Sequence, residues 1–170
     1  ELEQLLLHKL YTLKDGIINN LKDYNFHKLQ KDLLNFCALD LSSFYFDIRK
    51  DTLYCDDTNS KKRKSCITLL NIILECLLKW YAPVLSFTTE EISSLSSNNN
   101  KNSIHEQTFP VLPNNWKNDK LYKKWERLLF IRQQVNISIE EKRSQKIIGS
   151  SLEANVEISL PKSDFQLLND

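Results

Sequence analysis

The densest positive charge in the sequence lies in one short stretch between two apolar segments. It combines a lysine, a tyrosine and a run of four basic residues, namely Lys50, Tyr54, Lys61, Lys62, Arg63 and Lys64. Lysine and arginine bind the backbone phosphates of a nucleic acid and release counterions, and a tyrosine ring offers a surface on which an unpaired base stacks. These residue types therefore indicate a surface that holds a phosphate backbone beside splayed bases.

A second basic zone, nearer the C-terminus, contains Lys142, Arg143 and Lys146. The net charge of the chain is only +1, so it is the distribution of charge, and not its balance, that suggests an anionic partner. The alternative for the first zone is a solvated loop whose charges keep the chain soluble. Helix stability does not explain that zone, because cations at a helix N-terminus are unfavourable by about 0.3–1 kcal/mol.

Residues suited to nucleotide binding or catalysis are sparse. The only glycines are Gly16 and Gly149, which excludes a glycine-rich phosphate loop. The three histidines and four cysteines match no metal-ligand spacing. We expect no catalytic residue, no metal site and no disulfide, with Cys37, Cys66 and Cys76 packing as small apolar side chains.

Apolar residues recur at helical spacing over most of the chain and predict five helices. The expected ranges are 3–22, 26–48, 65–82, 88–95 and 118–145. The first two helices should form an antiparallel pair, and the third, which is apolar almost all round, should lie at the centre of a bundle. Pro83 should end this third helix, and the spacing of Thr88 and Glu91 predicts a capping box for the fourth.

The pattern changes to alternation at residues 152–160 and predicts a half-buried β-strand. One strand cannot satisfy its own backbone groups, so with no second strand and no methionine we expect a fragment of a larger protein. We expect a helical domain over 1–146 and a junction strand and tail over 147–170, with the last ten residues frayed. The low-complexity stretch 93–103 should be a mobile loop.

Length and composition favour a globular chain of about one domain, since 170 residues with 41% hydrophobic residues can bury a core. No apolar run approaches the roughly 20 residues that cross a bilayer, and the first residues lack the layout of a secretory signal. We therefore expect a cytoplasmic monomer with no membrane partner.

Three stretches resemble the C-terminal anticodon-binding region of bacterial isoleucyl-tRNA synthetase. They are "YNFHKLQKDLLNFCALDLSSFYFDIRKDTLYCDD", "KKRKSCITLLNIILECLLKWYAPVLSFTTEEI" and "WERLLFIRQQVNISIEEKRSQKIIGSSLEANV". The segment "APVLSFTTEEI" resembles the valyl and leucyl enzymes as well, whereas "FYFDIRKDTLY" and "KIIGSSLEA" are similar to the isoleucyl enzyme more narrowly. The resemblance covers about residues 5–158.

This resemblance implies a mainly α fold. The expected architecture is an antiparallel helical bundle of the class Ia aminoacyl-tRNA synthetase anticodon-binding type with a short C-terminal β-strand, and it docks the anticodon stem-loop of isoleucine tRNA. The parent enzymes join isoleucine to ATP, with magnesium, and transfer it to the tRNA 3′ end. Their catalytic signatures do not occur here, so this chain alone should be inactive and hold no cofactor, and zinc is implied only further toward the C-terminus of the parent.

Several positions match the family's motifs. They are Lys50, Asp51 and Tyr54 in one turn, Arg63 and Lys64 as a basic pair, and Ser150, Leu152, Glu153 and Ala154 at the junction. Thr52 and Lys64 stand where arginine is frequent in the family, and Ile67 where glutamine is. Because lysine lacks the planar fork of arginine, binding should depend more on Lys61, Lys62 and Arg63.

Two alternatives stay open. The bundle could be a structural or interaction module with little RNA affinity of its own, which the near-neutral charge favours, or it could be the equivalent domain of valyl- or leucyl-tRNA synthetase, which "KIIGSSLEA" opposes. The RNA-binding hypothesis predicts that changing Lys62 and Arg63 together to alanine weakens binding to every tRNA and lowers its salt dependence, with the fold intact.

Overall fold

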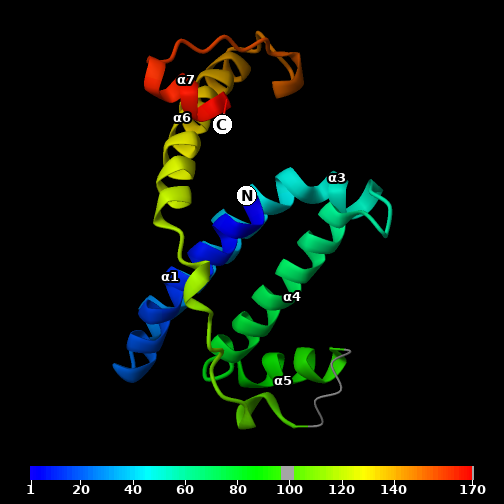
Figure 1. The fold of residues 1–170 in the computed structure, drawn as a ribbon, viewed down its shortest axis with the longest axis vertical. Coiled ribbons are helices and arrows are strands. Elements are labelled where there is room, and N and C mark those ends of the chain that lie inside the picture. Colours follow the sequence, from blue (N-terminus) through cyan, green and yellow to red (C-terminus); the bar gives the residue numbers. More distant parts are fainter. Residues whose placement is uncertain (97–101, 170) are drawn as a thin grey trace. The chain divides into compact units, whose positions relative to one another are not determined.

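The structure is a computed structural model that describes residues 1–96 and 102–169, and these residues are mainly helical (Figure 1). Contacts divide the chain into two compact units, Glu1–Lys117 and Asn118–Asp170, and each is described by itself. The second unit includes the last long helix. The expected division into a helical domain over 1–146 and a junction and tail over 147–170 stays a prediction.

The first unit opens with a helical hairpin. Helix α1 (Leu2–Lys22) and helix α2 (Phe26–Asn35) are joined by three residues. Tyr24 adopts a left-handed conformation, with φ of 55°, and the amide of Asn25 donates to the carbonyl of Asn20 at 2.8 Å while that of Tyr24 donates to Leu21 at 3.2 Å. This pattern is a Schellman motif, which ends α1 and reverses the chain.

A continuous helical path leads from α2 through the π-helical segment η1 (Phe36–Phe46) into helix α3 (Asp47–Cys55). Three side-chain pairs join α1 to this path: Asn20 with Asp32, Lys9 with Asp40, and Glu3 with Arg49. Residues earlier in α1 pair with residues later in this path, so the two run antiparallel. The predicted antiparallel pair of helices is confirmed. The path continues to Cys55, seven residues beyond the expected end at 48.

An ion pair between Glu3 and Arg49 joins α1 to α3, and both side chains are largely shielded from solvent. Nε of Arg49 lies 2.8 Å from Oε1 of Glu3, and the thiol of Cys66 in α4 approaches the same oxygen at 3.6 Å. Burial works to raise the pKa of Glu3, but the backbone amide of Glu3 and the charge of Arg49 outweigh burial and lower it. This carboxylate therefore stays charged and fixes three helices to one another.

Helix α4 (Lys61–Tyr81) follows a turn and packs on α1, α3, helix α5 (Ser86–Leu95) and the short η2 (Ile104–Glu106). Its buried stripe recurs every three or four residues and consists of Cys66, Leu69, Ile73, Cys76 and Trp80. Ile67 and Leu74 are exposed by about two fifths, so α4 is central in its contacts but is not buried all round as predicted. Burial raises the pKa of Cys76 to about 12, consistent with packing as an apolar side chain.

Helix α4 ends at Tyr81, before Pro83, as predicted. Helix α5 begins at Ser86, two residues before the predicted capping box, and its N-cap residue Leu85 makes no side-chain cap bond. The capping-box prediction is wrong, because Thr88 lies inside the helix. Of the loop predicted over 93–103, residues 97–101 lie outside the described residues.

Two short 3₁₀ turns, η2 and η3 (Asn114–Trp116), complete the first unit. Glu90 accepts a hydrogen bond from the hydroxyl of Ser103 at 2.8 Å and another from the amide of Ile104 at 2.9 Å, and these two bonds lower the pKa of its carboxyl group. The hydroxyl of Tyr11 donates to Oδ1 of Asn114 at 2.9 Å. Side-chain hydrogen bonds thus hold both turns to the helices.

The second unit consists of helix α6 (Asp119–Ser144), the 3₁₀ turn η4 (Ser151–Glu153), an extended segment and helix α7 (Lys162–Asn169). The guanidinium of Arg127 in α6 donates two hydrogen bonds to the carboxylate of Asp164 in α7, at 3.1 and 2.6 Å. These bonds lower the pKa of Asp164, which is 6% exposed. We expected the last ten residues to fray, whereas the structure holds most of them in α7.

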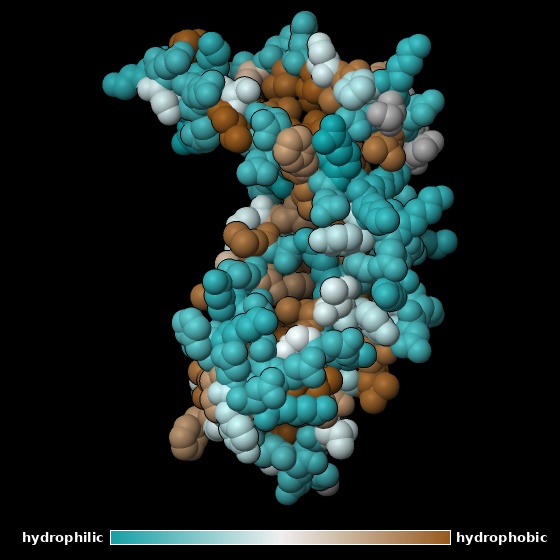
Figure 2. Space-filling model, turned by 90° about the vertical axis from the view of Figure 1, so that its left-hand side faces the viewer, coloured by the Kyte–Doolittle hydropathy of each residue, from teal (hydrophilic) through white to brown (hydrophobic). Residues whose placement is uncertain are grey.

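The predicted C-terminal strand is wrong. Residues 154–160 are extended, but no strand is assigned among the described residues, and Leu152, expected on the buried face, is 94% exposed. Residues 153–159 all line a groove beside α6, the polar ones as well as the apolar ones, and Figure 2 shows apolar side chains gathered on the visible face of the second unit. Alternation alone does not make a strand, which also requires a paired backbone.

Within the described residues, no helix combines the length and the apolar character that a membrane span requires.

Candidate nucleic-acid interface

The connection between α3 and α4 is a hydrogen-bonded turn. The amide of Asn59 donates to Oδ1 of Asp57 at 2.7 Å, and the amide of Ser60 donates to the Asp57 carbonyl at 2.9 Å. The hydroxyl of Ser60 caps α4 by accepting from the amide of Arg63, at a long 3.5 Å, and it lies 3.4 Å from a carboxylate oxygen of Asp56. The stretch is therefore an ordered turn, and its middle residues are exposed to solvent.

The four basic residues at the start of α4 divide into two pairs. Nη1 of Arg63 donates to the carbonyl of Asp56 at 2.8 Å, and Nζ of Lys64 lies 3.2 Å from Oδ1 of Asn59. Both side chains are thus directed back onto the turn. Lys61 and Lys62 are exposed, and within the described part of the chain their side chains form no ion pair or hydrogen bond.

Lys50 and Tyr54 lie on α3, just before this turn. Lys50 is exposed and pairs with Asp47 at 3.3 Å, on its own helix. The ring of Tyr54 is 85% exposed, in the last turn of α3. We call Lys50, Tyr54, Lys61 and Lys62 the α3–α4 surface, since α3 and α4 contact each other and the connecting turn joins them.

Electrostatics disfavours two of these lysines where they stand. Lys61 and Lys62 occupy the first turn of α4, where the helix macrodipole is positive and each cation costs about 0.3–1 kcal/mol. Neither has an acidic partner that compensates, and Asp56 and Asp57 are engaged by the hydrogen bonds of the turn. Two exposed, uncompensated cations on α4 and an exposed aromatic ring on the preceding helix are residue types suited to phosphate and base contact.

The second basic zone has a structural explanation. Lys142 and Arg143 lie in the last turn of α6, where cations are favourable, and Arg143 pairs with Glu140 at 2.7 Å. Lys146 has a φ of 58°, and its amide donates to Arg143 at 2.9 Å while that of Ile147 donates to Lys142 at 3.0 Å. This is a second Schellman motif, so the zone is built into the end of a helix.

The two zones lie in different compact units, the first in Glu1–Lys117 and the second in Asn118–Asp170. The structure therefore brings Lys50, Tyr54, Lys61, Lys62, Arg63 and Lys64 together around one turn. It gathers Lys142, Arg143 and Lys146 around a separate helix end.

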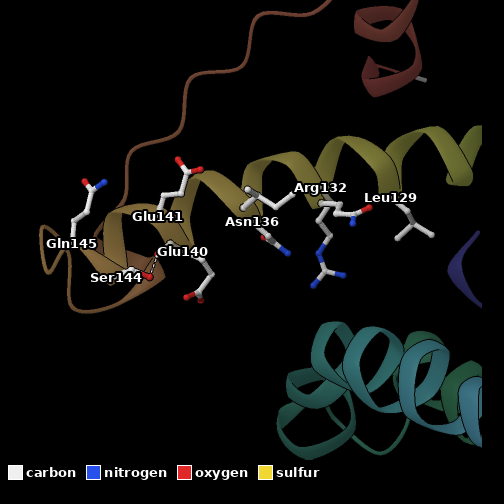
Figure 3. A pocket seen from close by; sticks show the side chains of 9 residues that line it. Leu129, Arg132, Asn136, Glu140, Glu141, Ser144 and Gln145 are labelled. Carbon is white, nitrogen blue, oxygen red and sulfur yellow. Dashed lines mark hydrogen bonds between the residues drawn. The ribbon is translucent and has the colours of Figure 1, made fainter.

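A surface hollow of about 670 Å³ follows α6 and its C-cap residue (Figure 3). Its nine lining residues all fall between Leu129 and Gln145, with Arg132, Glu140 and Glu141 as the charged members. None of the residues predicted for the site lines it, although Glu141 and Ser144 flank Lys142 and Arg143 in the sequence. The lining includes no cysteine, histidine or lysine and presents no arrangement of nucleophile and base.

Candidate metal ligands do not gather in the part of the chain that the structure describes, where no three His, Cys, Asp or Glu side chains could hold an ion. Cys66 and Cys76 are buried, Cys37 is half-buried and Cys55 is exposed, all as free thiols. Glu90, whose pairing with Glu91 could suggest acid–base chemistry, is occupied by Ser103 and Ile104.

Sequence reasoning missed the residues that shape the turn, namely Asp56, Asp57, Asn59 and Ser60. A serine before a helical stretch is an N-cap signal, and it would have started α4 at Lys61 instead of at 65. The basic run would then have been placed inside the helix, with its cations distributed around the first turn.

Comparisons with known proteins identify the family of this chain. A family model described as the anticodon-binding domain of tRNA ligase matches residues 3–158. The chain is 56% identical to the isoleucine–tRNA ligase of Pelagibacter ubique over 167 residues, which are 98% of this chain and 18% of that relative. For the Agrobacterium fabrum enzyme of the same name the identity is 43% over 165 residues, 97% of this chain and 17% of the relative.

The isoleucine–tRNA ligase of Mesorhizobium japonicum is 42% identical over 154 residues, 91% of this chain and 15% of the relative. The chain thus spans less than a fifth of the length of these curated relatives. The family match extends over most of both compact units. The chain therefore belongs to the family of anticodon-binding domains of tRNA ligases.

Proposed function

We propose that the α3–α4 surface contacts the anticodon stem-loop of isoleucine tRNA. The observation that carries this proposal is the pair Lys61 and Lys62, exposed and uncompensated at the start of α4, which follows the helix that carries the exposed ring of Tyr54. Lysines there neutralise backbone phosphates, and the tyrosine ring stacks on an unpaired loop base.

The whole protein, in this proposal, attaches isoleucine to its tRNA with ATP and magnesium. The name shared by the relatives supports it, and so does their greater length, in which the matched part is at most 18%. ATP and magnesium belong to parts of those proteins outside the matched region, as does any zinc. The contribution of this chain is to bind and orient the tRNA.

A cytoplasmic monomer is part of the same proposal. Every residue of the α3–α4 surface comes from one compact unit, so a second copy is not needed to complete it.

The test is fluorescence anisotropy of the chain with labelled anticodon stem-loops of isoleucine tRNA and valine tRNA, titrated over salt concentration. We expect tighter binding to the isoleucine stem-loop and an affinity that falls steeply with salt. Weak binding that does not distinguish the two RNAs would indicate a structural module instead. Preference for the valine stem-loop would assign the chain to the valine enzyme.

A further inference from the structure

Arg63 stands out from the basic run because its side chain turns inward. Its Nη1 donates to the carbonyl of Asp56 at 2.8 Å, its Nε has no access to solvent, and the residue as a whole is half-buried. Of the five N–H groups of this guanidinium, one is thus bonded to the turn and the Nε–H is buried, which leaves the second Nη1 hydrogen and the two of Nη2. The residue therefore differs from Lys61 and Lys62, whose side chains are free.

The carbonyl that Arg63 holds is at a specific place in the fold. Asp56 is the C-cap of α3, two residues after Tyr54, and a cation at a helix C-terminus is favourable with the macrodipole. Arg63 itself lies in the first turn of α4. One side chain thus fastens the end of α3 to the start of α4, across a turn of only a few residues.

We infer that Arg63 is a positioning residue for RNA binding: it fixes the C-terminus of α3 against α4, so that Tyr54 and the two free lysines face the same RNA. This inference rests on the proposed function and refines it, because it removes Arg63 from the phosphate contacts that the sequence pattern suggested. Ser60 and Asn59 hold the same turn from its other side through the cap and Lys64.

The experiment separates a contact from a positioning role by the salt dependence of affinity for the isoleucine anticodon stem-loop. A lysine that touches a phosphate contributes about 0.7–0.9 to the slope of log K against log salt, whereas a residue that only positions others contributes none. We expect Arg63→Ala to weaken binding by about 5- to 150-fold, the range that one base–aromatic stack is worth. The salt slope should stay at the wild-type value.

The matched variant is Lys61→Ala with Lys62→Ala, which should lower the slope. Coupling gives a second readout: in a Tyr54→Ala background, the loss caused by Arg63→Ala should nearly vanish, because both changes remove the same stacking contact. Circular dichroism checks that each variant stays helical. If Arg63→Ala does not fold, Arg63→Gln replaces it, and we expect weaker binding because the shorter neutral side chain does not reproduce the bond to the Asp56 carbonyl.

The outcomes are distinguishable. A slope that falls with Arg63→Ala, or an affinity that does not change, would overturn the positioning role while leaving the proposed function in place. Full affinity in Arg63→Gln would also overturn it, since the bond to the Asp56 carbonyl would then be dispensable. Absence of wild-type binding would overturn the proposed function and this inference with it.

Discussion

Helix α4 begins with a basic run, Lys61–Lys64, and helix α6 ends with another, Lys142 to Lys146. Both resemble nucleic-acid contacts in sequence, but their positions relative to the helix dipoles are opposite. The cations at the end of α6 stabilise their helix and are partly ion-paired, whereas Lys61 and Lys62 oppose the dipole of α4 without a partner. A cation that destabilises its own element needs another use, so the α4 end is the better candidate for RNA contact.

The comparison also shows that neighbouring basic residues of one run can have different roles. Within Lys61–Lys64, Arg63 and Lys64 hold the preceding turn, and only the first two lysines are free. Within the α6 end, Lys146 is committed to a left-handed backbone conformation. By number of charges the two zones are similar candidates for RNA contact. The partners and helix positions of those charges favour the start of α4.

The largest expected effect is on RNA affinity. Replacing Lys61 and Lys62 with alanine should weaken binding of the isoleucine anticodon stem-loop by about 60-fold at roughly 0.1 M salt, if both lysines contact phosphates and release counterions fully. Anisotropy measures it. The control is Lys28→Ala with Lys31→Ala, which removes the same charge from exposed positions on α2, at the far end of the hairpin. An equal loss in both variants would mean that only net charge matters.

A smaller effect concerns the stability of the α6 end. Lys146→Gly should raise the free energy of unfolding of this helix end by about 0.5–1 kcal/mol, because glycine adopts the left-handed conformation without a Cβ clash. Amide hydrogen exchange of the last α6 residues measures it. RNA affinity should not change, and a marked loss would restore Lys146 as an RNA contact. Tyr24→Gly tests the same motif at the end of α1.

The smallest effect has opposite signs at the two helix ends. Lys142→Gln should lower the stability of α6 by about 0.3–1 kcal/mol at low salt, while Lys61→Gln should raise that of α4 by a similar amount. Glutamine has a helix propensity close to that of lysine. A change in helix stability, measured by amide hydrogen exchange, therefore reflects the loss of the charge. Both changes should shrink as salt increases. Changes of the same sign would show that the dipole does not distinguish the two zones.

Much of the fold follows from periodicity. The expected range 3–22 differs from α1 by one residue at its start and agrees at its end, and the expected range 118–145 differs from α6 by one residue at each end. The antiparallel hairpin also follows, since three residues joining two apolar faces leave little choice. Periodicity did not predict the extension of α3 to Cys55, because that segment has few buried residues.

The wrong predictions concern sequence patterns that are compatible with two local structures. Thr88 and Glu91 have capping-box spacing, yet α5 starts earlier and encloses them. Residues 152–160 alternate as a strand does, but the described chain provides no backbone to pair with them, and the segment lies along α6 instead. Pairing is a property of two segments, and one segment's sequence carries no information about the other.

The sequence by itself determined the class of the protein, the helices and the two places where positive charge gathers, because residue type and spacing act over a few residues. Tertiary structure alone decided which of those charges are available. The Arg63 side chain donates to the carbonyl of Asp56, seven residues earlier, whereas the side chains of Lys61 and Lys62 make no such bond and are exposed. Availability depends on what folding brings within hydrogen-bond distance, and that is set by backbone geometry that the charge pattern does not encode.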